Sequence, residues 1–312
     1  MLQYQRVPNA PTGYYPGHDQ MIAGKAEQGY PGCMNGWSPM VWNYQEWSFI
    51  LSWIVQIGIL IVSSIALAKE GIPETLALVL LLETIVQFVE IAWYSIVGGL
   101  YLFGKMSIDV GYRYADWLIT TPVMLTTLLF FGLWDANRCV RLEDLFGYDG
   151  SRVAAFVVMI VADVLMLAVG AAYANARKDG NGFWADLARW YDGIVWFSKE
   201  KNVGIFLGWI FFLGAFAPLF VVMITDSFRI GGQLTIILSF ITWALYGVVA
   251  VAKDYAKSLS PITSNALYNI LDLIAKNILG LVVSIVVLNG NYKPADLQCT
   301  MVGGRPWEAS LL

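Results

Sequence analysis

The chain has 312 residues, of which 58% are hydrophobic and 13% are charged, with a mean hydropathy of +0.60. This composition excludes an ordinary soluble domain and indicates a protein of the lipid bilayer. The formal net charge of −4 adds little, and we expect no nucleic-acid partner.

Residues 1–45 are polar and rich in Pro, Gly and Tyr. They lack the basic start and the apolar stretch of a secretory signal, so we expect them to persist as a tail. The single histidine, His18, lies in this tail, so we expect no histidine metal site. Cys33, Cys139 and Cys299 fall in three separate non-membrane segments, so no disulfide framework follows. Cys33 either links two chains or remains a free thiol.

Seven apolar runs are long enough to span a bilayer, which takes about 20 residues. They predict an all-α membrane protein whose seven-helix domain covers residues 46–290, followed by a C-terminal tail, 291–312. We expect the third run to begin earlier, near Asp109. In the long connection 177–201, apolar residues at helical spacing predict an amphipathic helix on the surface. The seven runs are Trp47–Leu67, Thr75–Phe103, Trp117–Leu133, Val153–Ala174, Val203–Ile224, Leu234–Val251 and Ile262–Leu288.

The second and third spans carry polar side chains at helical spacing. In the second, Glu83, Gln87 and Glu90 share one face. Carboxylates at bilayer depth mark ion or proton paths by default. In the third span, Asp116, Thr120 and Thr127 also share a face, and Arg113 lies one turn before Asp116.

Lys276 lies in the middle of the seventh span, with Asp272 four residues before it, on the same helical face. A lysine at this depth is costly and usually functional. One interpretation is a buried structural ion pair. The other is a lysine kept for a Schiff base with an aldehyde, whose positive charge then requires carboxylate partners such as Asp272 and Asp116.

The segments "RYADWLITTP" in the third span and "LDLIAKNILG" in the seventh resemble the signature segments of microbial (type 1) rhodopsins. The resemblance covers about residues 47–288 and implies a seven-helix bundle with all-trans-retinal bound covalently to Lys276. It implies that Asp116 and Asp272 are the counterions and proton acceptors and that Arg113 gates the extracellular side. It further implies that the N-terminal tail and the connection 177–201 are extracellular and that the C-terminal tail 291–312 is cytoplasmic. It also implies a location in the plasma membrane and a dimer or trimer. Such a protein is not an enzyme.

Further positions match the retinal pocket of this family one by one. Gly247 stands where the family usually has proline, and we expect this departure to loosen the helix beside the retinal ring. Several of these side chains are aromatic, and without the lysine ordinary core packing would explain them. The pocket positions are Trp117, Thr120, Thr121, Met124, Asp163, Met166, Gly170, Trp209, Phe212, Trp243 and Tyr246.

Three activities fit this resemblance. Outward proton pumps of the family carry a carboxylate at the position of Thr127, the donor position, and threonine cannot donate a proton at a useful pKa. A sensor acting through a partner protein would use the tail and the connection 177–201. The Glu83–Gln87–Glu90 stripe is instead similar to the second helix of channelrhodopsins, especially divergent or viral-type ones.

Two further features extend the likeness to channels. Aligning Tyr94 with the family tyrosine near the arginine puts Glu90 level with the Schiff base. Asn277 follows the lysine directly, as in those channels, and Ser63 in the first span is expected to complete a Ser63–Glu90–Asn277 constriction. We therefore predict a light-gated channel for protons and monovalent cations such as Na⁺ or K⁺, with the proton pump as the alternative and the sensor after it.

Overall fold

The computed structural model describes residues 44–102, 112–138, 140, 150–175 and 201–290. Within these ranges the chain forms seven α-helices, one π-helical turn and no strand. Each helix is long and apolar enough to cross a membrane. The elements are α2 (Tyr44–Leu67), α3 (Glu74–Leu102), α4 (Arg113–Ala136), α6 (Gly150–Asn175), α8 (Lys201–Thr225), α9 (Ile230–Ala250), η2 (Val251–Tyr255) and α10 (Pro261–Asn289).

The helix ends follow from local sequence. Helix α10 begins where the Ser260 hydroxyl accepts a hydrogen bond from the Thr263 amide and Pro261 occupies the first turn. Most predicted boundaries agree with these ends to within a few residues. Helix α2, however, already includes Tyr44 and Gln45, which the sequence assigned to the tail. That boundary was wrong because polar side chains at a helix end carry no apolar signal.

Several predictions fall outside the described residues. They concern the tail with His18 and Cys33, the start of the third span at Asp109, and Cys139. The amphipathic segment 177–200 and the C-terminal tail 291–312, which holds Cys299, also lie outside them.

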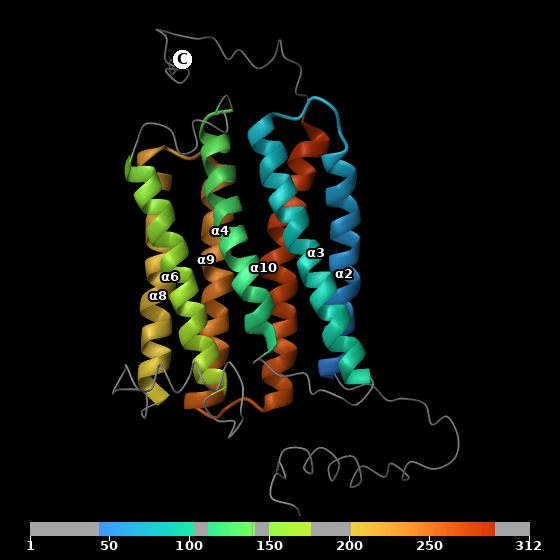
Figure 1. The fold of residues 1–312 in the computed structure, drawn as a ribbon, viewed down its shortest axis with the longest axis vertical. Helices are drawn as coiled ribbons and strands as arrows, with labels where there is room; N and C mark the ends of the chain where they lie inside the picture. The colour runs from blue at the N-terminus through green and yellow to red at the C-terminus, as the bar shows by residue number, and fades with distance from the viewer. Residues whose placement is uncertain (1–43, 103–111, 139, 141–149, 176–200, 291–312) are drawn as a thin grey trace, which may run out of the picture. The chain divides into compact units, whose positions relative to one another are not determined.

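The seven helices run alongside one another in a single bundle (Figure 1). Helix α3 packs between α2 and α4, and α10 packs against α2, α3 and α9. Helices α4 and α10 are the most enclosed of the seven. Polar side chains on α4 and α10 therefore face protein and not lipid, as the cost of lipid-exposed charge requires.

At one end of the bundle, Lys69 joins α2 to the last turn of α10. Its Nζ donates hydrogen bonds to the carbonyl oxygens of Val287 at 2.8 Å, Leu288 at 2.9 Å and Gly290 at 2.6 Å. Carbonyls at a helix C-terminus have no partner within the helix, and a cation there also opposes the helix dipole. Lys69 thus caps α10 from a neighbouring element.

Candidate functional site

Helix α10 places Lys276 inside the bundle, where the residue is only 2% exposed. Its ammonium nitrogen donates to Glu90 Oε1 on α3 and, at 3.0 Å, to Asp116 Oδ2 on α4. Asp272 Oδ1, one turn earlier on α10, lies 3.8 Å from the same nitrogen. Three carboxyl groups therefore surround one amine. Burying that amine is tolerable because it is paired on several sides.

Asp272 bonds other groups more closely than it bonds Lys276. Its Oδ2 accepts hydrogen bonds from Arg113 and, at 2.9 Å, from Tyr94. Its Oδ1 accepts from Tyr246 at 2.8 Å and from Trp117 at 3.2 Å. The predicted counterion Asp272 thus holds Arg113 and three aromatic side chains in place as well as lying near the amine.

Arg113, at the first turn of α4, is held by two residues of α10. It donates to Asp272 and to Asn269 Oδ1, and its NH1 also lies 3.0 Å from the Tyr94 hydroxyl. Sequence analysis missed Asn269, although it precedes Asp272 by three residues and so lies on the same face of α10. That spacing was the available signal.

Glu90 was predicted as a pathway residue level with the lysine, and it contacts the lysine directly. Its second oxygen, Oε2, accepts a hydrogen bond from Gln56 Nε2 of α2 at 3.3 Å. The predicted contact of Ser63 with Glu90 was wrong. Ser63 lies seven residues, about 10 Å along the axis, beyond Gln56, and its hydroxyl bonds that of Ser284 at 3.0 Å. The residue of α2 that bonds Glu90 is therefore Gln56, and not Ser63 as the sequence predicted.

Asn277 does not complete the predicted constriction through its amide nitrogen. Its Nδ2 donates to the Leu273 carbonyl of its own helix at 2.9 Å, and its Oδ1 has no hydrogen-bond partner among the described residues. The side chain is buried, with 4% of the residue exposed. The side chains that bond Glu90 are therefore Lys276 and Gln56.

From Glu90 the polar stripe on α3 continues toward the end of the bundle where Lys69 lies. Gln87 and Glu83 are both fully buried. Gln87 Nε2 donates to the Lys276 carbonyl at 3.0 Å, whereas neither carboxyl oxygen of Glu83 has a hydrogen-bond partner in the described part of the chain. The hydroxyl of Thr127 on α4 lies beside the Glu83 carboxyl group and itself donates to the Val123 carbonyl at 3.0 Å.

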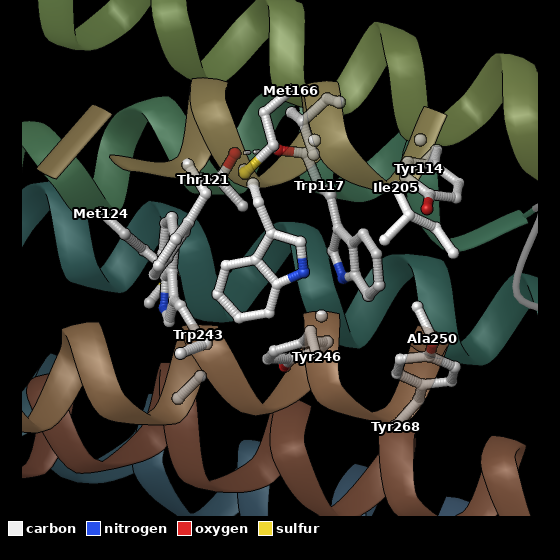
Figure 2. A pocket seen from close by; sticks show the side chains of 18 of the residues that line it. Tyr114, Trp117, Thr121, Met124, Met166, Ile205, Trp243, Tyr246, Ala250 and Tyr268 are labelled. Carbon is white, nitrogen blue, oxygen red and sulfur yellow. Dashed lines mark hydrogen bonds between the residues drawn. The ribbon is translucent and has the colours of Figure 1, made fainter. Parts of the chain in front are cut away.

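An apolar cavity of about 160 Å³ adjoins Lys276 on the side of α4, α6, α8 and α9. Figure 2 shows side chains of Trp117, Trp243 and Tyr246 around it. Nine of the eleven predicted pocket residues line the cavity: Trp117, Thr121, Met124, Met166, Gly170, Trp209, Phe212, Trp243 and Tyr246.

The other two predicted pocket residues lie behind the lining. The Asp163 carboxylate accepts a hydrogen bond from the Thr121 hydroxyl at 2.8 Å, so it supports the wall. Thr120 donates to the Asp116 carbonyl at 3.0 Å and helps to fix that turn of α4. Gly247, noted in the sequence beside the ring, also lines the cavity. Sequence analysis missed further lining residues, most of them small or aromatic: Tyr114, Leu167, Gly204, Ile205, Gly208, Ala244, Ala250, Tyr268 and Ala275.

Position 247 requires glycine for a steric reason that the sequence did not reveal. A Cβ at this position would lie 2.6 Å from Cζ2 of the Trp209 indole, well inside contact distance. Helix α9 remains helical through Gly247, and a π-helical turn follows from Val251 to Tyr255. The absence of a side chain at 247 therefore admits the Trp209 ring, which lies edge-on to Phe212 with centroids 5.5 Å apart.

The cavity and its lysine fit a long apolar aldehyde such as retinal. Lys276 lies on the cavity wall, and nearly all of the remaining lining is aromatic or aliphatic. Asp116 Oδ1 has no hydrogen-bond partner among the described residues, so the carboxylate retains a free acceptor beside the amine. The residues that would hold the retinal are Lys276 covalently and the aromatic lining by contact.

Comparisons with known proteins agree with this geometry. The model of the family described as bacteriorhodopsin-like protein matches residues 45–289, well over half of the chain. No curated protein sequence matches the chain significantly.

Among solved structures, the viral rhodopsin OLPVRII is 23% identical with a TM-score of 0.59, covering 79% of this chain and 98% of its own. Acetabularia rhodopsin I is 17% identical with a TM-score of 0.57, covering 80% and 97%. Halorhodopsin, a light-driven chloride pump, is 15% identical with a TM-score of 0.56, covering 81% and 98%. At these identities the structures show a shared fold.

Members of the matched family bind retinal through a Schiff base to a lysine and act as photoreceptors or light-driven transporters, not as enzymes. The chain is an integral, multi-pass membrane protein of seven helices. It belongs to the bacteriorhodopsin-like family of microbial rhodopsins and is a retinal photoreceptor.

Proposed function

We propose that the protein is a light-gated channel for protons and monovalent cations such as Na⁺ or K⁺. The observation that carries this proposal is the buried polar stripe Glu83–Gln87–Glu90 on α3, which faces α2 and α10 and not the retinal cavity. All three residues are fully buried. A purely structural role would require their polar atoms to be paired, because unpaired buried polar groups are costly.

Several oxygen atoms of the stripe and of the facing side of α2 lack hydrogen-bond partners among the described residues. They belong to Gln56, Glu83 and Gln87. Buried oxygens of this kind are normally satisfied by water or an ion. Acidic and carbonyl linings favour cations over anions. Together these features support a hydrated cation path between α2, α3 and α10.

The proposal includes a closed state in the dark. Lys276, Glu90 and Gln56 form a continuous hydrogen-bonded cluster across the path. Retinal, when bound, supplies the absorption of light and a change of shape at the Lys276 nitrogen. Asp116, whose Oδ2 lies 3.0 Å from that nitrogen, is the group positioned to take its proton. Glu90 then loses its cationic partner, which favours hydration of the cluster and entry of cations.

The test is voltage clamp of cells under illumination at two external cation compositions. A channel gives currents that reverse with the cation gradient, by up to about 59 mV for a tenfold change in a single permeant monovalent ion. Glu90→Gln should alter the selectivity or the amplitude. Glu74→Gln, a matched change at an exposed position of the same helix, should leave both unchanged. Outward current at every voltage would overturn the proposal.

An outward proton pump is the second candidate. It is supported by the pairing of Arg113 with Asp272 and Asn269 on the side of Lys276 opposite Glu83, and by the fold shared with halorhodopsin, itself a chloride pump. A pump predicts light-driven acidification of the medium that a protonophore abolishes. Thr127 stands where pumps of the family carry a donor carboxylate, which is why the channel is preferred.

We further propose that the protein resides in the plasma membrane with its N-terminus outside the cell, as a dimer or trimer. In this orientation Arg113 faces the extracellular side and Glu83 the cytoplasm. The sensor prediction rests on segments 1–45 and 177–201, which lie almost wholly outside the described residues.

A further inference from the structure

Glu83 is the most isolated charged side chain in the interior of the described bundle. It is 0% exposed, and within the described part of the chain neither of its carboxyl oxygens has a hydrogen-bond partner. An ideal Cβ at Gly280 of α10 would lie 3.4 Å from Glu83 Oε2 and 3.4 Å from Gln87 Nε2. The ends of Glu83 and Gln87 therefore lie against the same bare turn of α10.

Glu83 forms no ion pair with another described residue, and the cations of the neighbouring elements are bonded elsewhere. Lys276 is bound by Glu90 and Asp116, and Arg113 is bound by Asp272 and Asn269. Lys69 is used by the carbonyls at the end of α10.

The elements packed against this part of α3 are α2, α4 and α10. They present Ile59 and the Ser63–Ser284 pair, Thr127, and Gly280. None of these groups is charged. An ionised carboxylate at bilayer depth without a cation or a full set of donors is far less stable than its protonated form.

We propose that Glu83 carries a proton in the dark and is the internal acid that returns a proton to the Lys276 nitrogen after Asp116 has taken one. In this step the Glu83 O–H bond breaks and a new N–H bond forms at Lys276. The carboxylate that remains regains its proton from water at the Lys69 end of the bundle. No electrons are transferred. The inference rests on Lys276 as the retinal attachment site within the proposed function, but it does not require cation conduction.

The direction of return follows from the positions of the two acids. Asp116 lies on α4 one turn from Arg113, whereas Glu83 lies on α3 toward the Lys69 end. Glu83 and Glu90 are seven residues apart, about 10 Å along the helix axis, and Gln87 lies between them. Gln87 Oε1 has no hydrogen-bond partner among the residues that the structure describes, and Gln87 Nε2 donates to the Lys276 carbonyl. In this proposal, water bridging these oxygens carries the proton from Glu83 to the amine.

A donor at Glu83 also explains why the donor position on α4 can be a threonine, Thr127. Thr127 faces Glu83 across the contact between α3 and α4. The carboxyl group thus lies on α3, at the level where the third span supplies only a hydroxyl. In this proposal the internal proton donor, which is absent from position 127 of α4, is Glu83 of the neighbouring helix α3.

The first experiment asks whether Glu83 is protonated without light. Infrared spectra of the full-length protein, with and without retinal, should contain a protonated-carboxyl C=O band that disappears in Glu83→Gln. The band should persist in Glu74→Gln, which alters an exposed glutamate of the same helix. Glu83→Asp should shift the band without removing it, which separates loss of the acid from misfolding. A spectrum unchanged by Glu83→Gln would overturn the proposal.

The second experiment follows the return of the proton after a flash. In Glu83→Gln the recovery of the Lys276 proton should slow by about 100-fold and become dependent on the pH of the medium, while Glu74→Gln recovers like the parent protein. Unchanged, pH-independent recovery in Glu83→Gln would show that another group is the donor. Loss of photocurrent selectivity without a change in recovery would count against this inference alone. Absence of photocurrent with slowed recovery would count against the channel alone.

Discussion

A methyl group added at Gly247 tests how closely Trp209 is held against α9. The ideal Cβ would lie 2.6 Å from Trp209 Cζ2, and ordinary contact begins at 3.4 Å. The indole in Gly247→Ala must therefore move by about 0.8 Å. It cannot do so alone, because Trp209 lies edge-on to Phe212, which in turn stacks on Phe240 with centroids 5.1 Å apart.

The expected cost combines two opposing effects. Overpacking of a well-packed interior costs about 1–3 kcal/mol, whereas replacing glycine by alanine within a helix gains up to about 1 kcal/mol. We expect Gly247→Ala to lower the free energy of unfolding relative to Gly58→Ala, a control position with no heavy atom within 4 Å of the added Cβ. A difference of 1 kcal/mol corresponds to about 2–4 °C in Tm for a chain of this size.

The assay is thermal unfolding of Gly247→Ala, Gly58→Ala, Trp209→Phe and the double mutant that combines Trp209→Phe with Gly247→Ala. Because the smaller ring relieves the clash, the two substitutions should be non-additive by about 0.5–3 kcal/mol. The absorption maximum with bound retinal should shift in Gly247→Ala and remain unchanged in Gly58→Ala. Equal melting of both alanine variants, together with additivity in the double mutant, would refute the argument.

Three further substitutions test the polar centre. Lys276→Ala should give a colourless protein after incubation with all-trans-retinal, and unfolding should require about 3–5 kcal/mol less because Glu90 and Asp116 lose their cation; a coloured variant would contradict the attachment site. Asp116→Asn should move the absorption maximum to longer wavelength, because a weaker counterion stabilises the ground state less; an unchanged spectrum would assign that role to Glu90. Gln56→Leu removes the amide donor of Glu90 and should cost about 1–3 kcal/mol in thermal unfolding, whereas Ser64→Ala, on an exposed face of the same helix, should cost little; equal melting of these two variants would count against the Gln56–Glu90 bond.

The positions of the helices could be predicted from the sequence because each apolar run in a membrane protein must satisfy its own backbone hydrogen bonds. The pairing of Asp116 with Lys276 could also be predicted, since a buried ammonium needs carboxylates and few are present within the spans. The spacing of four residues put Asp272 on the same helical face as Lys276. It did not reveal that Arg113 donates a hydrogen bond to one of the Asp272 carboxylate oxygens.

Contacts between helices were harder to predict. Gln56 and Ser63 are both fully buried on one face of α2, and α2 offers no charged residue in the bilayer that would fix its axial position against α3. The choice between them therefore depended on alignment, and the alignment was seven residues off. Gly247 was noticed as a departure, but its cause is a ring from α8, and such a steric relation depends on packing that the local sequence does not encode.

The cap that Lys69 places on α10 limits how the bundle can deform. Tilting α10 away from α2 as a rigid rod would remove the Lys69 donor from three carbonyl oxygens at once. If α2 and α10 bend apart only at their centres, around Gln56 and Lys276, the hydrogen bonds from Lys69 to α10 remain intact. We therefore expect the gap between α2 and α10 to widen on illumination only near the centre of the membrane. A spin-label distance between the C-terminal ends of α2 and α10, which Lys69 joins, should stay constant throughout the light cycle.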